Sequence, residues 1–352
     1  MPSSPPEAPG AAALSDPPQS AISARGLTRS FRDLVAVDGL TLEVRKGALF
    51  GLVGPDGAGK TTTLRMLAGV LPPTSGDALV GGVSVARDPE GVKHHIAYMA
   101  QRFGLYHDLT VRENIDFYAD LYQVPAAERP QRLERLYRFS SLGTFEHRLA
   151  GQLSGGMKQK LSLCCALVHH PEILLLDEPT FGVDPISRRD LWLILHQMVA
   201  EGVTVLVTTA YMDEAERCDQ VALLHRGTVV ALDTPQALQR SYAGEMVAVR
   251  VSDRRAAAHA LGGVPGVRRA AVFGDTIHVT LASRDRDWPA AAQALAAVGI
   301  QVLDTSVSSP SLEDVFIERI GDRESGAATQ GPGSTGDGAG PSHPAPYTPH
   351  PQ

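Results

Sequence analysis

The hydrophobic positions of this chain are arranged in one way over most of its length and in another near its end. Between residues 22 and 232, short continuous apolar runs alternate with stretches in which apolar residues recur at helical spacing. Continuous apolar runs are typical of strands buried in a mainly parallel sheet, and the helices between them cover the two faces. The pattern therefore predicts an α/β domain, which we place at residues 21–235.

A different pattern follows a linker near residues 233–244. Four strand patterns are interleaved with two helix patterns, the strands at 246–251, 268–272, 277–281 and 300–307 and the helices at 256–261 and 289–298. The order β-α-β-β-α-β predicts a small ferredoxin-like α+β domain at residues 243–320. Ser311 and Asp314 have the spacing of a capping box, so we expect a last helix from there to Ile320.

The two ends of the chain lack both patterns. Residues 1–20 are mostly Pro, Ala and Ser, and residues 322–352 are Gly, Pro, Ser and Thr with almost no large apolar side chain. Such segments bury too little apolar surface to order themselves, so both are predicted to be disordered. No apolar run approaches the roughly 18 residues of a spanning helix, and we expect a protein that spans no membrane itself.

A phosphate-binding loop follows the first buried strand pattern of the α/β domain. Residues 54–61 fit the sequence G-x-x-x-x-G-K-[ST] and are followed by a helical stretch. Glycines let successive backbone N–H groups point at phosphates, and the helix presents its positive end. Lys60 is expected to reach the β- and γ-phosphates and Thr61 to hold Mg²⁺. The predicted nucleotide contacts are Gly54, Pro55, Asp56, Gly57, Ala58, Gly59, Lys60, Thr61 and Thr62.

Two carboxylates follow another buried strand pattern. The apolar run at 173–176 ends in Asp177 and Glu178. Ligands bind at the carboxyl ends of strands in open α/β sheets. Asp177 fits a Mg²⁺ partner of the phosphate loop, and Glu178 is placed to polarise an attacking water. Together with the loop, this pair predicts an enzyme that hydrolyses ATP with Mg²⁺.

The charge of the chain bears on its partners. It carries 32 Lys and Arg against 39 Asp and Glu, a net charge of −7, and has no basic stripe. A duplex-binding protein needs such a stripe to neutralise phosphates. We therefore expect no nucleic-acid partner.

The segment Leu153-Ser154-Gly155-Gly156 resembles the LSGGQ signature of ABC ATPases, and it stands before residues 174–178 at the family's spacing. The resemblance implies a P-loop NTPase of ABC type with a helical signature subdomain. It also implies that Ser154, Gly155 and Gly156 bind the γ-phosphate held by the opposite subunit of a head-to-tail dimer. A serine at a helix start followed by two glycines suits an anion.

Two further single residues, Gln101 and Phe31, match positions of the family. Gln101 resembles the Q-loop glutamine, which contacts Mg²⁺, takes part in catalysis and faces the membrane partner. Phe31 stands where the family stacks an aromatic ring on adenine, although a plain core phenylalanine is the alternative. Residues 101–122 are the expected dock for that partner, with Phe103, Leu105, Tyr106, Phe117 and Tyr122 as apolar anchors.

The resemblance implies an ATP-binding and hydrolysing subunit that powers export through separate membrane permease subunits. It would work with a second ABC ATPase subunit, identical or not, at the cytoplasmic face of the cell membrane. Residues 311–316 are similar to the tail of drug-exporter-type subunits and favour export. An importer ATPase is one alternative, and a soluble ABC protein acting on ribosomes or DNA is another. The chain has neither the second phosphate loop nor the heptads that the soluble relatives carry.

One position departs from the family. The switch region after the strand pattern at 203–207 carries Ala210 where the family has a histidine, and Met157 replaces the signature glutamine. Alanine cannot donate to a γ-phosphate, and losing one such donor costs about 10²- to 10³-fold in rate. The sequence therefore predicts slow hydrolysis at this chain's own site, unless Tyr211 or a water replaces the imidazole.

Overall fold

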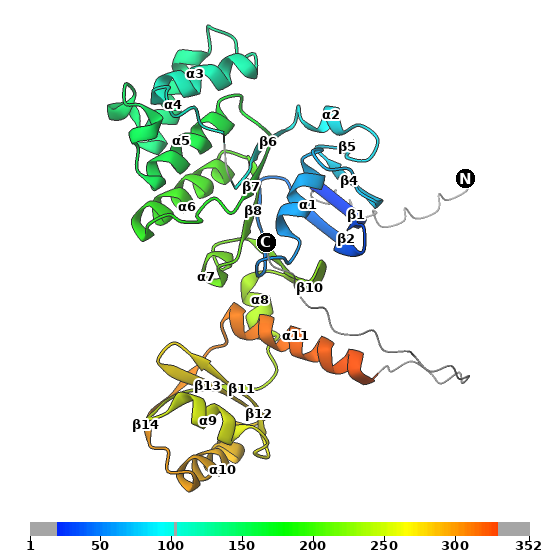
Figure 1. Ribbon diagram of the computed structural model, residues 1–352, viewed down its shortest axis with the longest axis vertical. Coiled ribbons are helices and arrows are strands. Elements are labelled where there is room, and N and C mark those ends of the chain that lie inside the picture. The colour runs from blue at the N-terminus through cyan, green and yellow to red at the C-terminus, as the bar shows by residue number, and fades with distance from the viewer. Residues whose placement is uncertain (1–19, 102–103, 330–352) are drawn as a thin grey trace, which may run out of the picture.

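The structure is a computed structural model that describes residues 20–101 and 104–329, with side chains up to residue 321. Its described strands form three sheets (Figure 1). The strands are β1 (Ser20–Phe31), β2 (Leu34–Arg45), β3 (Leu49–Val53), β4 (Ser75–Val80), β5 (Val83–Ser84), β6 (Ile96–Met99), β7 (Ile173–Asp177), β8 (Thr204–Thr209), β9 (Gln220–His225), β10 (Thr228–Asp233), β11 (Glu245–Val251), β12 (Val267–Phe273), β13 (Thr276–Leu281) and β14 (Val302–Ser308).

Helices cover these sheets and connect them. They are α1 (Lys60–Leu67), α2 (Pro89–Val92), α3 (Val111–Leu121), α4 (Arg129–Ser140), α5 (Gly155–Leu167), α6 (Pro185–Ala200), α7 (Met212–Ala215), α8 (Pro235–Arg240), α9 (Arg254–Leu261), α10 (Arg284–Ala297) and α11 (Leu312–Thr329), with the 3₁₀ helices η1 (Gly143–Phe145) and η2 (Ala150–Gln152). In the described part, no helix is both long and apolar enough to cross a membrane.

The central sheet has the strand order β10-β9-β3-β8-β7-β6 and is parallel except for β10. All five residues of β3 and of β7 are buried, because both faces of the sheet are covered. Along β7, Leu174 and Leu176 join the core cluster that includes buried residues of α3 to α6, whereas Ile173 and Leu175 join the one shared with α1 and the first sheet. The alternation explains why this strand is apolar without interruption.

The first sheet has the order β2-β1-β4-β5 and is antiparallel. On the other side of the central sheet, α3, α4, α5 and α6 form a helical group, at the upper left of Figure 1. A capping box begins α3, where Thr110 and Glu113 each accept a hydrogen bond from the other's backbone N–H.

The C-terminal sheet has the order β12-β13-β11-β14 and is antiparallel. With α9 and α10 it follows the predicted order β-α-β-β-α-β, so this part of the predicted fold is confirmed. The predicted start of the second helix at Pro289 is wrong, because α10 begins at Arg284. Its first turn is closed ahead of the proline, where Asp287 N–H donates to the Ser283 carbonyl and the Asp287 carboxylate accepts from Ser283 N–H.

The last helix is longer than predicted. It continues past Ile320 to Thr329, so the predicted end at Ile320 and the expectation of disorder from residue 322 are wrong for 322–329. The stretch holds Glu, Ala and Arg, which favour helices, and its first proline comes only at residue 332. Residues 330–352 and 1–19 lie outside the described residues, and β1 includes Ser20.

The first turns of α11 join the C-terminal sheet to the larger body. Leu312, Val315 and Phe316 are buried in the same core cluster as the central sheet. The helix contacts α7, α8 and β10, and the hydroxyls of Tyr242 and Thr280 lie 2.5 Å apart. Through α11 and the contact between Tyr242 and Thr280, the C-terminal sheet is therefore joined to α7, α8 and β10.

Candidate functional site

A cavity of about 710 Å³ opens where the β1–β2 turn, the loop before α1 and the end of β7 meet. One end is apolar and the other is lined by the glycine-rich loop. This division suits an aromatic base at one end and phosphates at the other, and the volume suits a small-molecule ligand. The lining residues are Phe31, Leu34, Val35, Ala36, Asp56, Gly57, Ala58, Gly59, Lys60, Thr61, Thr62, Gln101, Glu178, Phe181 and Arg226.

The phosphate loop connects β3 to α1 as the sequence predicts. Gly59 has a φ of 104°, and a Cβ there would come within 2.5 Å of the Ala36 carbonyl oxygen. A Cβ on Gly54 would come within 2.2 Å of the Leu224 carbonyl oxygen, so this glycine packs on β9 and does not line the cavity. Both glycines are needed for close backbone contacts that hold the loop in its curve.

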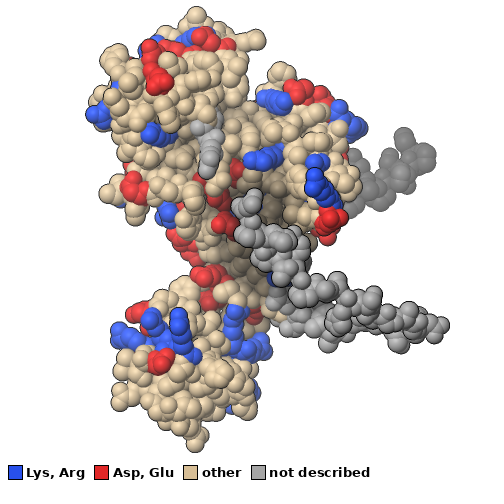
Figure 2. Space-filling view, in the orientation of Figure 1, with Lys and Arg blue, Asp and Glu red and all other residues tan. Residues whose placement is uncertain are grey.

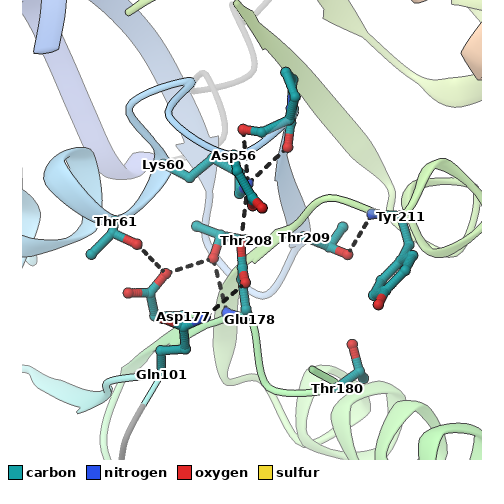
Figure 3. A network of polar contacts seen from close by, with 12 residues as sticks. Asp56, Lys60, Thr61, Gln101, Asp177, Glu178, Thr180, Thr208, Thr209 and Tyr211 are labelled. Carbon is teal, nitrogen blue, oxygen red and sulfur yellow. Dashed lines mark hydrogen bonds and ion pairs between the residues drawn. The ribbon is translucent and has the colours of Figure 1, made fainter. Parts of the chain in front are cut away.

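Lys60 is buried and held at the centre of the site (Figure 3). Its ammonium donates to the carbonyl oxygens of Gly54 at 2.8 Å and Pro55 at 3.1 Å, and it lies 3.0 Å from Glu178 Oε1. Gln101 Nε2 donates to Glu178 Oε2 at 3.1 Å. The glutamate carboxylate is thus held from two sides, and an incoming phosphate would compete with it for the lysine.

Glu178 has an unusual backbone conformation. Its φ is 50°, in the left-handed region, which a glutamate rarely adopts. Its N–H donates to Thr208 Oγ1 at 2.9 Å, which holds the residue against the end of β8. The conformation directs the side chain to Lys60 and Gln101.

Asp177 has one oxygen engaged and one without a partner. Its Oδ1 accepts from Thr61 Oγ1 at 3.0 Å and from Thr208 Oγ1 at 2.9 Å (Figure 3). Its Oδ2 is buried and makes no hydrogen bond to the described residues. Carboxylate and hydroxyl oxygens are the ligands that Mg²⁺ prefers, so the residues present fit this ion. Asp177 and Thr61, with Gln101, are the groups that would hold it.

The pKa of Asp177 is raised above its ordinary value. Burial is the main cause, and the negative charge of Glu178 adds to it, whereas the hydrogen bonds from Thr208 and Thr61 lower the pKa. The two hydroxyls therefore favour the ionised carboxylate in a site whose burial disfavours its charge.

The substitution Thr208→Val is expected to reduce ATP turnover about tenfold at neutral pH, because it removes the hydrogen bond to the Asp177 carboxylate and the acceptor of the Glu178 N–H. The pKa of Asp177 then rises further. Since falling pH protonates this carboxylate and weakens its hold on Mg²⁺, the loss of turnover on acidification moves to higher pH. The measurement is the pH profile of phosphate release.

Thr204→Val is the matched control for that experiment. Thr204 is buried at the other end of β8, and its hydroxyl accepts from Gly47 N–H. In this variant, turnover is expected to fall on acidification at the same pH as in the parent. If both variants shift it equally, the effect comes from the strand and not from Asp177.

Three predicted phosphate contacts lie elsewhere. Ser154, Gly155 and Gly156 are not among the described residues that line the cavity. Ser154 caps α5, accepting from Met157 N–H at 3.3 Å, and a Cβ on Gly156 would come within 2.1 Å of Ser187 Oγ on α6. Gly156 therefore lets α5 approach α6, and this chain's own loop does not meet its signature segment.

The apolar end of the cavity contains Phe31. Its ring is 42% exposed, and the Arg29 guanidinium lies 4.6 Å from the ring centroid. A ring this exposed is not a core phenylalanine, which removes that alternative. With one face covered by Arg29, the other is the face available for an aromatic base.

The switch region after β8 borders the phosphate loop, since Ala210 and Pro55 line the same groove. Ala210 and Tyr211 line a separate groove of about 500 Å³ beside α11. The Tyr211 ring lies under the Arg188 guanidinium, 4.4 Å from it. Behind it the buried Glu214 carboxylate accepts from Thr180 Oγ1 and Thr209 Oγ1, at 2.9 and 2.6 Å. The Tyr211 ring is therefore held beside Arg188, and its backbone N–H donates to Thr209 Oγ1 at 3.0 Å.

Sequence reasoning missed several residues at the site. Thr208 was one, although a polar residue at the end of an apolar strand was the available signal. The others line the cavity from distant segments, namely Leu34, Val35, Ala36, Phe181 and Arg226.

Comparison with known proteins places this site in a family. The sequence model described as "ABC transporter" matches residues 37–181, and that described as "ATP-binding protein DrrA1-3-like, C-terminal domain" matches 234–320. The "Daunorubicin/doxorubicin resistance ATP-binding protein DrrA" of Streptomyces peucetius is 34% identical over 308 residues, which are 86% of this chain and 93% of that protein. The chain belongs to the ABC transporter ATP-binding proteins. Members of this family bind ATP and are ATPases that drive transport.

Other relatives of this ABC protein support the same family assignment. The "Probable multidrug ABC transporter ATP-binding protein YbhF" of Escherichia coli is 42% identical over 305 residues, 85% of this chain. The match covers 52% of YbhF, so the chain spans about half the length of that relative. The solved "Structure of ATP binding subunit of ABC transporter" is 30% identical, with a TM-score of 0.58 over 63% of this chain and 92% of that one. The ABC fold predicted from the sequence is confirmed.

Proposed function

We propose that this chain binds and hydrolyses ATP to power export through separate membrane permease subunits. The observation that carries the proposal is the joining of Lys60, Asp177 and Glu178 at one edge of the central sheet. Export is favoured by the relatives' names, which specify multidrug transport, daunorubicin resistance and Nod factor export. The β-α-β-β-α-β domain, matched by the DrrA-type model, supports export over the importer alternative.

Each group of the site has a role in the proposed reaction. The loop N–H groups and Lys60 bind the β- and γ-phosphates, and Phe31 stacks on adenine. Thr61, Asp177 and Gln101 would hold Mg²⁺, which would supply positive charge to the phosphates. Glu178 orients the attacking water and accepts its proton as the water oxygen bonds to the γ-phosphorus, while the β–γ bridging oxygen leaves with ADP.

A second ABC ATPase subunit is part of the proposal. Ser154 to Gly156 lie outside the cavity of their own chain, which supports their binding the γ-phosphate in a partner. We assign ATP binding to residues 21–235 and treat 243–320 as a second domain.

The permease is expected to contact the surface near Gln101. Tyr106 and Phe117 lie there with 46% and 37% of their surface exposed, and their rings meet at 4.6 Å. Leu105 and Tyr122 are instead packed against the core, so we no longer expect them to contact the permease. Phe103 lies outside the described residues.

The experiment that tests the function has two readouts. Purified protein should release phosphate from ATP only with Mg²⁺. In cells it should sediment with membranes when its permease is present and stay in the supernatant when the permease gene is deleted. Firm membrane attachment without the permease would contradict the proposal, and the absence of phosphate release would contradict the hydrolase assignment.

The substitution Ala210→His is expected to raise single-turnover hydrolysis by about 10²- to 10³-fold, because it restores a donor at the γ-phosphate. We infer that the parental subunit alone is slow and that a partner with an intact histidine would do most of the turnover. The measurement is phosphate release from enzyme in excess over ATP. A fast parental rate that the histidine leaves unchanged would reject the slow-site idea.

A further inference from the structure

The two edges of the C-terminal sheet differ in how they are protected. The edge strand β12 carries Arg268 and Arg269. The opposite edge strand, β14, has no Lys, Arg or Pro, and its one charged residue, Asp304, lies 3.4 Å from Arg250 on β11. Edge strands usually carry Lys, Arg or Pro, because these residues prevent the free backbone groups of the strand from pairing with another chain.

The β14 edge is seven residues long and exposes three apolar side chains, and its pairing with β11 is regular from Asp304 to Ser308 and shifts register at Leu303. Six of its seven residues are exposed, among them Val302 at 38%, Leu303 at 58% and Val307 at 68%. Its inner side pairs with β11, and no described strand pairs with its outer side. Figure 1 shows β14 at the outer edge of the sheet, away from the ATP-binding part. An edge of this kind is expected to be covered by another strand.

The sequence of β14 is complementary to itself. When a strand pairs antiparallel with its own copy across a twofold axis, opposed residues must lie on the same face of the sheet. An axis at Thr305 places Leu303 opposite Val307 of the second copy, and Asp304 opposite Ser306. An axis at Asp304 would oppose two carboxylates, which is destabilising. The Thr305 register alone joins Leu303 with Val307, the two most exposed apolar side chains of the strand, without a charge conflict.

A groove beside β14 can receive these side chains. It has a volume of about 410 Å³ and is lined by Arg284, Asp285, Trp288 and Pro289 of α10 together with Val247, Thr305, Ser306 and Val307. Val307 is opposite Val247 in the β11–β14 register, and Val247 packs in the core beneath α9 and α10. Thr305 and Val307, opposite Val249 and Val247, therefore share the helix-covered face, and Leu303 of the second copy, opposed to Val307, would enter this groove.

We propose that β14 pairs antiparallel with β14 of a second copy of this chain about Thr305, joining two C-terminal sheets into one. The contact uses no residue of the nucleotide site, so it does not need ATP. It would keep two copies together at high effective concentration when their nucleotide sites separate.

A cysteine at the twofold axis tests the pairing directly. Directly opposed residues have Cα atoms about 4.5–5.5 Å apart, within the range of a disulfide. Cys164, Cys165 and Cys218 are all buried, so Thr305→Cys adds an accessible thiol. Nucleotide-free Thr305→Cys is expected to form a covalent dimer on mild oxidation. The control Val272→Cys, at an exposed position on β12, is expected to remain monomeric on a non-reducing gel.

Charge substitutions test the register. In nucleotide-free sedimentation velocity the parent is expected to be a dimer, and Leu303→Lys with Val307→Lys to raise its dissociation constant at least about tenfold. Leu303→Lys with Val307→Glu is expected to restore the dimer, because each lysine then faces a glutamate of the second copy. Val272→Lys is the matched control on the other edge. Circular dichroism checks that each variant is folded.

Three results would overturn the proposal: a monomeric parent, a Lys/Lys variant that dimerises normally, or a Lys/Glu variant that does not. A variant truncated after residue 329 tests one further possibility. If it dimerises through β14 while the full chain does not, the segment after 329 covers the edge and the proposal is wrong. Phosphate release from the same samples tests the proposed ATPase separately, since its loss leaves the pairing result intact.

Discussion

Replacing Glu178 with glutamine is expected to lower ATP turnover by about 10²- to 10⁴-fold, the usual contribution of a general base, while ATP binding is retained. Glutamine keeps the size of the side chain and its hydrogen bond from Gln101, but its amide cannot accept the proton of the attacking water. It also loses the ion pair with Lys60, so it no longer competes with phosphate for the ammonium. Single-turnover phosphate release and equilibrium binding of a fluorescent ATP analogue measure the two effects.

The control for that variant is Glu172→Gln. Glu172 stands just before β7, and its side chain is 65% exposed beside His95. It should keep both binding and turnover. Parental turnover in Glu178→Gln would show that another group is the base, and a joint loss of binding and turnover would indicate a damaged site.

Replacing Lys60 with alanine is expected to weaken ATP binding by about a hundredfold or more, roughly 3 kcal/mol. The ammonium is 4% exposed, and charge-assisted hydrogen bonds to phosphate are strong in such a setting. Its removal also leaves the Glu178 carboxylate uncompensated beside the phosphates, which adds repulsion. Isothermal titration with ATP and Mg²⁺ measures the change.

Two further variants separate these causes. The double variant Lys60→Ala with Glu178→Gln removes the repulsion and is expected to recover part of the affinity. Lys93→Ala removes an exposed lysine paired with Glu90 and is expected to change nothing. Equal affinity of the parent and Lys60→Ala would rule out the assigned role of this lysine.

The site could be predicted from sequence where its functional residues are consecutive in the chain. The phosphate loop and the Asp177-Glu178 pair each follow a buried strand directly, so their place at the sheet edge follows from local pattern and parallel pairing. Thr208 and Phe181 could not be placed in this way. Their contacts depend on the register of β7 against β8 and on how loops fold over the edge, which local patterns do not specify.

The errors have similar physical origins. The predicted helix start at Pro289 is wrong because the reciprocal hydrogen bonds of Ser283 and Asp287 begin α10 earlier. The extension of α11 was missed because its last residues carry no apolar periodicity. Tyr122 stacks on His169 at 3.9 Å between ring centroids, a contact across segments that hydrophobicity alone could not reveal.

The left-handed backbone of Glu178 has a cost for the folded protein. A side chain with a Cβ in that region destabilises a protein by about 1–3 kcal/mol relative to an unstrained conformation. Glycine would relieve this strain, so selection for a higher melting temperature would favour loss of the carboxylate that the proposed reaction needs. We therefore expect the thermal tolerance of this protein to be limited in part by its proposed catalytic group, and efforts to stabilise it are better directed at positions remote from the end of β7.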